Sequence, residues 1–201
     1  MLRHTLIPLK RFPQVFPVVT SIILVQTIVF VMILLSGKAN DPSTWGRYGA
    51  FVGWRIDEGE YWRLIFSLFV HVDFMQLFVV ALSIYILAPQ LEWFFGKLPF
   101  LFLFLVTGFF GNLGVYLMGT EGVYTGAFES IYGLVGVYLF LYIRGMIHPL
   151  LGRGLLVILI INLVFDYHFL FAHILALLSG FVFAAIFIQY KQMKENQDSE
   201  Q

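Results

Sequence analysis

Long apolar runs separated by short polar turns make up most of this chain. Six stretches approach the length of a membrane helix, which needs about 20 mostly apolar residues. They cover residues 18–36, 64–87, 98–118, 127–143, 155–165 and 169–190. The fifth is short, and residues 150–154 can extend it past Arg153. The pattern predicts an all-α, polytopic membrane protein built as a bundle of six transmembrane helices.

The composition agrees with this picture and excludes other classes of protein. Of the 201 residues, 60% are hydrophobic and 12% are charged, whereas a soluble domain carries about 25% charged residues. The 12 Lys and Arg residues balance the 12 Asp and Glu residues, so no net basic field indicates a nucleic-acid partner. The chain has no cysteine, which excludes disulfides, thiolate metal ligands and a cysteine nucleophile. We expect a lipid bilayer as the surroundings and no cofactor.

Three segments are expected along the chain: a cytoplasmic N-terminal segment at 1–16, a membrane domain at 17–190, and a polar, disordered cytoplasmic tail at 191–201. The first apolar run is longer than that of a signal peptide and no small-residue cleavage site follows it, so we expect it to remain as an anchor. Lys and Arg in short loops favour the cytoplasm. Eight of the 12 lie on the side that both termini share. This bias predicts a multi-pass protein of the cell membrane with both termini in the cytoplasm.

The loop at 37–61 would then be extracellular. This segment and the residue after it are rich in aromatic side chains, namely Trp45, Tyr48, Phe51, Trp54, Tyr61 and Trp62. Such side chains favour the membrane–water interface. Two interpretations stay open: an interfacial loop that lies partly in the outer leaflet, or an ordinary aromatic belt.

Ionisable residues inside apolar stretches are costly in a bilayer and mark candidate functional sites. The candidates are His71, Asp73, Glu129 and His173. All of them lie near the predicted extracellular ends of the second, fourth and sixth stretches. A wet cavity open to the outside would explain this shared depth, and so would helix ends that already lie among the headgroups.

Small residues recur at helical spacing in two of the stretches. They are Gly126, Ser130, Gly133 and Gly136 in and just before the fourth, and Ala176, Gly180 and Ala184 in the sixth. Small residues let membrane helices approach closely. We therefore expect the fourth and sixth helices to form the central pair.

Several motifs, in order, are similar to those of one known family. They are Glu60 to Ile65 before the second stretch, then His71, Pro89, Leu91, Glu92 and Gly96, then Gly111 to Leu113, the ungapped run 126–136, and finally His173, Ile174, Ala176 and Gly180. From Glu60 to the end of the sixth stretch, the chain resembles the rhomboid intramembrane serine proteases in their bacterial six-helix form. This resemblance implies a serine–histidine dyad that cleaves peptide bonds within the membrane.

The resemblance places the nucleophile of the family in a G-x-S-G motif at the start of the fourth helix. Here that motif reads Gly126-Ala127-Phe128-Glu129, so Phe128 occupies the position of the nucleophile. The position of the general base is His173. A phenyl ring offers no nucleophilic atom to an acyl-enzyme mechanism. The chain is therefore expected to be a pseudoprotease, in which Phe128 plugs the vacant cavity between the fourth and sixth helices.

The oxyanion side of the family carries the pattern H-x4-H-x3-N on the second helix. Here it reads His71, Gln76 and Val80. An amide at position 76 can still donate a hydrogen bond, whereas Val80 offers no donor. Loss of one oxyanion donor costs roughly 2.7–4 kcal/mol of transition-state stabilisation. This side of the site is weakened as well.

Three functions stay open at this point. The first, which the resemblance favours, is an inactive rhomboid-like protein that binds or retains the transmembrane segments of client proteins. The second is an active protease in which Ser130 is the nucleophile. In a regular helix, Ser130 is rotated by about 200° from position 128 and so faces away from the nucleophile position. The third is a small transporter, for which no inverted repeat is visible.

Other candidate residues have structural interpretations. His173 is either a remnant that hydrogen-bonds to Gln76, Tyr132 or Glu129, or a contact for a ligand or partner. A metal held by His71, His173 and Glu129 is chemically conceivable, but nothing in the spacing requires one. Glu92 is expected to stabilise the bundle through Lys97 or local backbone N–H groups. Structural roles are also expected for Gly126, Tyr132, Gly133 and Gly180.

Overall fold

The computed structural model describes residues 8–36 and 41–199. Four of its helices are long and apolar enough to cross a membrane. They are α2 (Pro17–Leu35), α6 (Phe74–Phe95), α7 (Lys97–Leu117) and α10 (Leu170–Ser199). Two shorter apolar helices, α8 (Phe128–Ile143) and α9 (Pro149–Phe165), bring the described apolar helices to the six that the sequence predicts. The all-α membrane bundle is confirmed.

The boundaries differ from the prediction in three places. The second membrane helix begins at Phe74 and not at residue 64, because the apolar run before it forms the short helix α5 (Arg63–Phe66) and the 3-10 turn η3 (Ser67–Phe69). The Asp73 carboxylate then accepts a hydrogen bond from the Gln76 N–H at 2.8 Å and caps α6. Helix α9 begins at Pro149. Helix α10 continues to Ser199, so the expected tail is helical over its described part.

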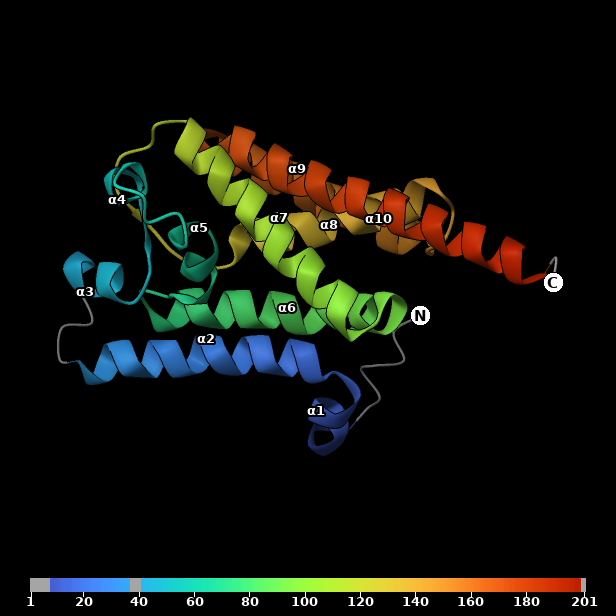
Figure 1. Ribbon diagram of the computed structural model, residues 1–201, viewed down its shortest axis with the longest axis horizontal. Helices are drawn as coiled ribbons and strands as arrows, with labels where there is room; N and C mark the ends of the chain where they lie inside the picture. The colour runs from blue at the N-terminus through green and yellow to red at the C-terminus, as the bar shows by residue number, and fades with distance from the viewer. Residues whose placement is uncertain (1–7, 37–40, 200–201) are drawn as a thin grey trace.

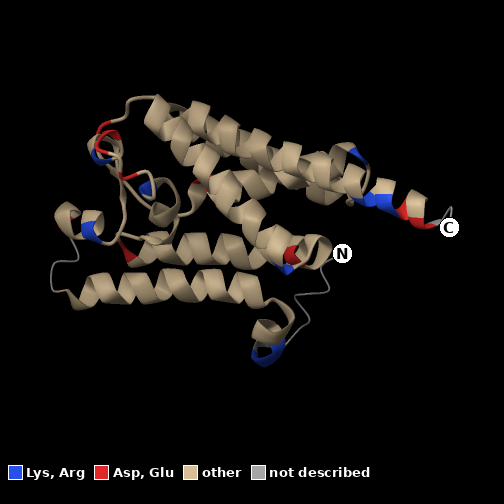
Figure 2. Ribbon diagram, in the orientation of Figure 1, with Lys and Arg blue, Asp and Glu red and all other residues tan. Residues whose placement is uncertain are grey.

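The smaller elements lie together at one end of the bundle (Figure 1). They are α3 (Pro42–Arg47), β1 (Phe51–Val52), α4 (Gly53–Asp57), α5, η3, β2 (Val123–Tyr124) and the 3-10 turn η4 (Tyr167–Phe169). We call this end the loop end. The turn η2 (Leu9–Arg11), α1 (Phe12–Val15) and the C-terminal part of α10 lie at the other end. Figure 2 shows most charged residues at these two ends, with apolar helices between them, as a bilayer requires.

Helices α8 and α10 form the centre of the bundle, as the small residues predict, and each also packs on α7. A Cβ atom added to Gly180 would overlap the carbonyl oxygen of Gly133, and one added to Gly136 would overlap that of Leu177. The backbones therefore touch without intervening side chains. This close approach depends on glycine at both crossing positions.

Helix α2 lies beside α6, and a buried carboxylate fastens the two helices together (Figure 1). The Glu92 oxygens accept hydrogen bonds from the backbone N–H groups of Val18 at 3.0 Å and Val19 at 2.9 Å. These groups belong to the first turn of α2, which has no partner of its own for them and attracts negative charge. The sequence indicated Lys97 or local backbone N–H groups as partners of Glu92, whereas these N–H groups belong to another helix.

The aromatic segment at the loop end is a folded layer. The buried Arg63 guanidinium donates to the carbonyl oxygens of Gly46 at 2.7 Å and Ala50 at 2.9 Å. Strands β1 and β2 pair antiparallel, with Phe51 opposite Tyr124. This pairing joins the layer to the segment that enters α8, and so fixes the backbone next to position 128.

Candidate functional site

Three segments bring the candidate residues together at the loop end. Gly126 turns the chain from β2 into α8 with a φ of +94°, which favours glycine. Its N–H donates to the Ser67 carbonyl at 3.0 Å. Phe128 and Glu129 are the first residues of α8, and His173 lies in the first turn of α10. Of the positions that the family resemblance indicated, Gln76, Phe128 and His173 line one cavity.

His173 is buried and both of its ring nitrogens face carboxylates. Nδ1 lies 3.0 Å and 3.2 Å from the two oxygens of Glu129, and Nε2 lies 3.2 Å from Oδ2 of Asp166. The Tyr132 ring stacks on the imidazole with centroids 4.0 Å apart. Of the partners proposed from the sequence, Glu129 and Tyr132 contact His173, whereas the amide of Gln76 is bonded elsewhere.

This arrangement has a direct chemical consequence. A carboxylate accepts hydrogen bonds and donates none, so both contacts of His173 are hydrogen bonds only when each ring nitrogen carries a proton. In that state the ring has no lone pair with which to accept a proton from a nucleophile. The position of the general base is occupied, but its basic atom is committed to Glu129 and Asp166.

Sequence reasoning missed Asp166. It directly follows α9, at the start of the connection to α10, and its side chain is half exposed at 51%. The sequence signal for this contact was the spacing, because Asp166 lies seven residues before His173. In a continuous helix this spacing is two turns and puts both residues on one face. Because the intervening residues form the turn η4 before α10 begins, that spacing alone did not fix the contact.

Gln76 lines the cavity and crosslinks two segments beside it. Its Oε1 accepts from the Val72 N–H at 2.9 Å, and its Nε2 donates to the Thr125 carbonyl at 3.0 Å. The Thr125 hydroxyl donates back to Oε1 at 3.2 Å. Val80 is fully buried in the apolar core. These bonds use one of the two amide hydrogens of Gln76, and Val80 offers no donor to an oxyanion.

His71 lies in the turn before α6 and is fully buried. Both of its ring nitrogens lack a hydrogen-bond partner among the described residues. Burial lowers the pKa of His71 to about 4, so the ring is neutral at pH 7. Over residues 8–36 and 41–199, no group of three potential ligands is placed to hold a metal ion. His71, Glu129 and His173 are thus not gathered around one point.

Phe128 does not plug the cavity. Its side chain is 39% exposed and forms part of the wall of a cavity of about 330 Å³. The expectation that it fills this volume is wrong for a local reason. The ring folds back over Gly126, where an added Cβ would lie 3.3 Å from Cε2 of Phe128.

Ser130 faces away from His173. It is fully buried, and its hydroxyl donates to the Phe104 carbonyl of α7 at 2.9 Å. A Cβ atom added to Gly108 of α7 would overlap this hydroxyl. Ser130 is therefore a helix-packing residue in this structure, and its oxygen has no contact with the imidazole.

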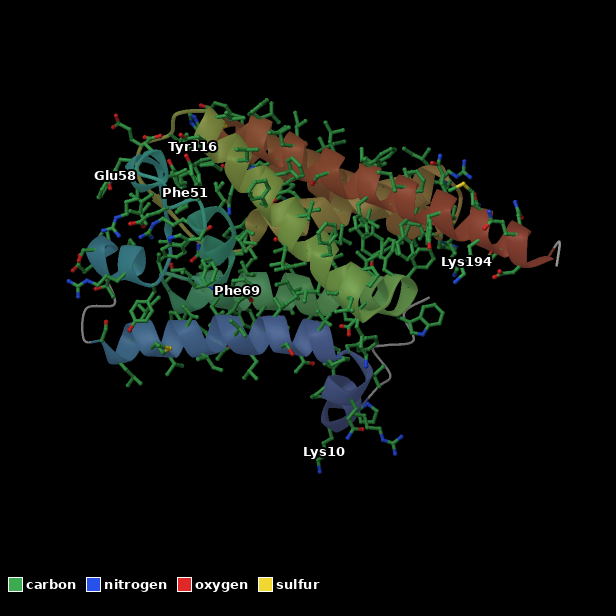
Figure 3. All side chains as sticks on the ribbon, in the orientation of Figure 1. Lys10, Phe51, Glu58, Phe69, Tyr116 and Lys194 are labelled. Atoms are coloured by element: carbon green, nitrogen blue, oxygen red, sulfur yellow. The ribbon has the colours of Figure 1, made fainter. Side chains whose placement is uncertain are left out.

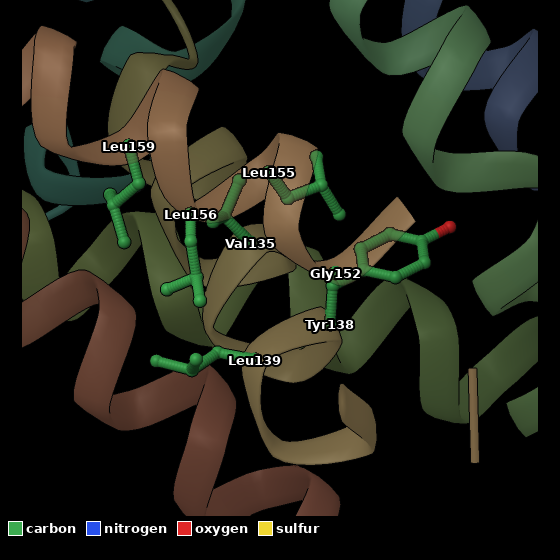
Figure 4. A pocket seen from close by; sticks show the side chains of 7 residues that line it. All are labelled: Val135, Tyr138, Leu139, Gly152, Leu155, Leu156 and Leu159. Atoms are coloured by element: carbon green, nitrogen blue, oxygen red, sulfur yellow. The ribbon is translucent and has the colours of Figure 1, made fainter. Parts of the chain in front are cut away.

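Other hollows lie away from His173. The crevice in Figure 4, between α8 and α9, is lined by Val135, Tyr138, Leu139, Gly152, Leu155, Leu156 and Leu159. Its volume of about 10 Å³ is at the lower limit for a single water molecule. A wider hollow of about 690 Å³ lies at the loop end near Phe51 and Tyr116, which Figure 3 labels. Of the residues in the family motifs, Val135 lines the first hollow and none lines the second.

Comparisons with known proteins identify the family. The rhomboid domain model matches residues 58–190. The rhomboid protease candidate YdcA of Bacillus subtilis (strain 168) is 30% identical over 199 residues, which cover 92% of this chain and 96% of YdcA. The rhomboid protease GluP of the same organism is 27% identical over 169 residues, covering 81% of this chain and 33% of GluP. RHOMBOID-like protein 5 of Arabidopsis thaliana is 32% identical over 95 residues, covering 46% of this chain and 31% of that protein.

The chain belongs to the rhomboid family. With its apolar helices, it is a multi-pass membrane protein whose surroundings are a lipid bilayer. A small transporter is not favoured by this membership.

Proposed function

We propose that this protein is a catalytically inactive rhomboid of the cell membrane that binds or retains transmembrane segments of other membrane proteins. The observation that carries the proposal is the commitment of both ring nitrogens of His173 to carboxylates. A rhomboid mechanism needs a hydroxyl and a free basic nitrogen in hydrogen-bond reach of each other. Phe128 supplies no hydroxyl, and His173 offers no free nitrogen.

Side access for a client helix is supported by the loose packing of α9. Of its residues, Gly152 and Leu159 are buried. Much of the rest of its apolar surface is exposed toward the bilayer, at Val157, Ile158, Ile160, Val164 and Phe165. Helix α9 packs mainly against α8, so few contacts oppose a small outward movement. A client helix would then meet the cavity beside His173.

The orientation belongs to this proposal. The Lys and Arg bias puts both termini in the cytoplasm and the loop end outside. The cavity would consequently open toward the outer leaflet, where it would meet the outer ends of client helices.

A cleavage assay tests the proposal. The purified protein, in liposomes with a model transmembrane substrate, should give no product and no labelling by a fluorophosphonate probe. Phe128→Ser alone should also be inactive, because His173 remains bound to Glu129 and Asp166. The triple variant Phe128→Ser, Glu129→Gly, Val80→Asn releases one ring nitrogen and restores the family residues. Cleavage by the parent protein, or by Phe128→Ser at the level of the triple variant, would refute inactivity.

The Ser130 alternative is tested in the same assay. If Ser130 were the nucleophile, the parent protein would be labelled and Ser130→Ala would lose the label. Its hydroxyl bond to Phe104 predicts that both are unlabelled. Client binding is tested separately with a photo-reactive benzophenone residue placed on α9. On illumination, this residue should form crosslinks to other membrane proteins. A covalent link between α9 and α8 should abolish these crosslinks.

A further inference from the structure

The cavity beside His173 has the opposite hydrogen-bonding character to an oxyanion hole. An oxyanion hole presents free donors, whereas most side-chain donors here already bond other protein groups, with the second amide hydrogen of Gln76 left over. Gln76 donates to the Thr125 carbonyl, and the Thr125 hydroxyl donates to Gln76. The His173 nitrogens face Glu129 and Asp166.

Asn112 adds an unpartnered acceptor to the same wall. It is 5% exposed and lines the cavity from α7. Its amide nitrogen donates to the Leu64 carbonyl and to the Ser67 hydroxyl oxygen, both at 2.9 Å, which uses both amide hydrogens. Its carbonyl oxygen Oδ1 has no hydrogen-bond partner among the described residues. This oxygen is not one of the fully buried side-chain atoms that lack a partner among the described residues, so it is accessible from the cavity and can accept from a donor there.

The charges agree with the hydrogen bonds. With His173 protonated, the Glu129 and Asp166 carboxylates leave the cluster with one net negative charge. No Lys or Arg is found among the described residues that line the cavity. The N–H groups of the first turn of α8 are donors at this wall, and the Glu129 carboxylate lies in that turn. The aromatic part of the wall consists of Trp45, Tyr124, Phe128 and Phe169.

We infer that this cavity binds a basic side chain, Lys or Arg, of a client transmembrane segment, with Asn112, Glu129 and Asp166 as the acceptors. The inference rests on the proposed client-binding function and names the feature by which clients are selected. An ammonium or guanidinium group supplies donors and positive charge, and aromatic faces attract such a group. Basic residues near the ends of membrane helices extend toward polar surroundings. Asp166, half exposed at the mouth, would meet the group first, and the buried Glu129 would hold it.

Binding of matched peptides to the full protein in phosphatidylcholine nanodiscs tests this inference. Two leucine-rich transmembrane peptides carry either lysine or norleucine at one position near the outer end. The lysine peptide should bind at least tenfold more tightly. Asp166→Asn and Glu129→Gln should each reduce that ratio, and together bring it to about one. Asp57→Asn, which removes a carboxylate at the same end but outside this cavity, should leave the ratio unchanged.

The possible outcomes separate the two proposals. If both peptides bind equally well, client binding stands and selection for a basic residue is wrong. If neither binds, the client function is wrong. The charge preference of the cavity is then tested with a small cation. n-Butylammonium should raise the melting temperature of the parent protein but not of the double variant Asp166→Asn, Glu129→Gln. An equal or larger rise with butyrate would overturn the charge preference. Loss of the lysine preference in discs containing phosphatidylethanolamine would assign the site to lipid amines and overturn the client assignment.

Discussion

Gly180 of α10 lies directly against the carbonyl group of Gly133 of α8, with no room for a side chain between them. Gly180→Ala should therefore force the central helices apart. Overpacking of this kind costs about 1–3 kcal/mol, which thermal unfolding in detergent would measure. The matched control is Gly154→Ala in α9, where an added Cβ meets nothing within 4 Å. Equal melting temperatures for the two variants would contradict the tight crossing.

Glu92 supports a second prediction, about the attachment of α2. Glu92→Gln keeps one acceptor oxygen but turns an amide NH₂ toward a backbone N–H, so one of its two bonds to α2 is lost. Loss of a hydrogen bond to a charged, buried group costs about 1.5–3 kcal/mol. We expect Glu92→Gln to be cleaved faster by an added protease and to have a lower melting temperature than the parent protein. Glu195→Gln, on the exposed part of α10, should behave like the parent; a similar fall there would point to a general effect of charge.

His71 predicts a particular dependence of stability on pH. Its pKa of about 4 in the folded protein is below the ordinary value of 6.5. The folded state therefore keeps the full contribution of this group above pH 6.5 and loses it as the pH falls from 6.5 toward 4. His71→Asn should flatten that part of the melting-temperature profile. Parallel profiles for parent and variant between pH 7 and pH 4.5 would show that His71 does not titrate with unfolding.

The topology can be tested because the natural chain has no cysteine. A cysteine at position 43, made by Ser43→Cys in α3, should react with an impermeant maleimide added to intact cells. Ser199→Cys, at the end of α10, should react only after the cells are opened. The reverse pattern would invert the orientation and put the cavity on the cytoplasmic side.

Much of the fold follows from periodicity and length. Apolar runs identify the helices whatever their partners are, and glycine spacing identifies the α8–α10 crossing. The break between η3 and α6 was missed because residues 64–70 are as apolar as the helix that follows. The polar residues His71 and Asp73 mark the break, but the prediction places both of them inside the second membrane stretch at 64–87.

From the sequence, only those parts of the site that lie within the family motifs could be predicted. The motif around Phe128 predicts that the nucleophile is absent, and Glu129 is one of the partners that the sequence offers for His173. The contact with Asp166 depends on how α9 returns to α10, and the direction of the Phe128 ring depends on the Gly126 turn. Both are set by tertiary structure, which a pattern along the chain does not encode.

The bond between Glu92 and the first turn of α2 also has a consequence for the order of assembly. The carboxylate is synthesised 74 residues after Val18. At a translation rate of about 5–20 residues per second, the first turn of α2 is synthesised roughly 4–15 s before its cap exists. During this interval its first N–H groups must be satisfied by water or headgroups, which holds that end of α2 at the membrane surface. The first membrane helix is therefore inserted before the residue that fastens it to α6 exists.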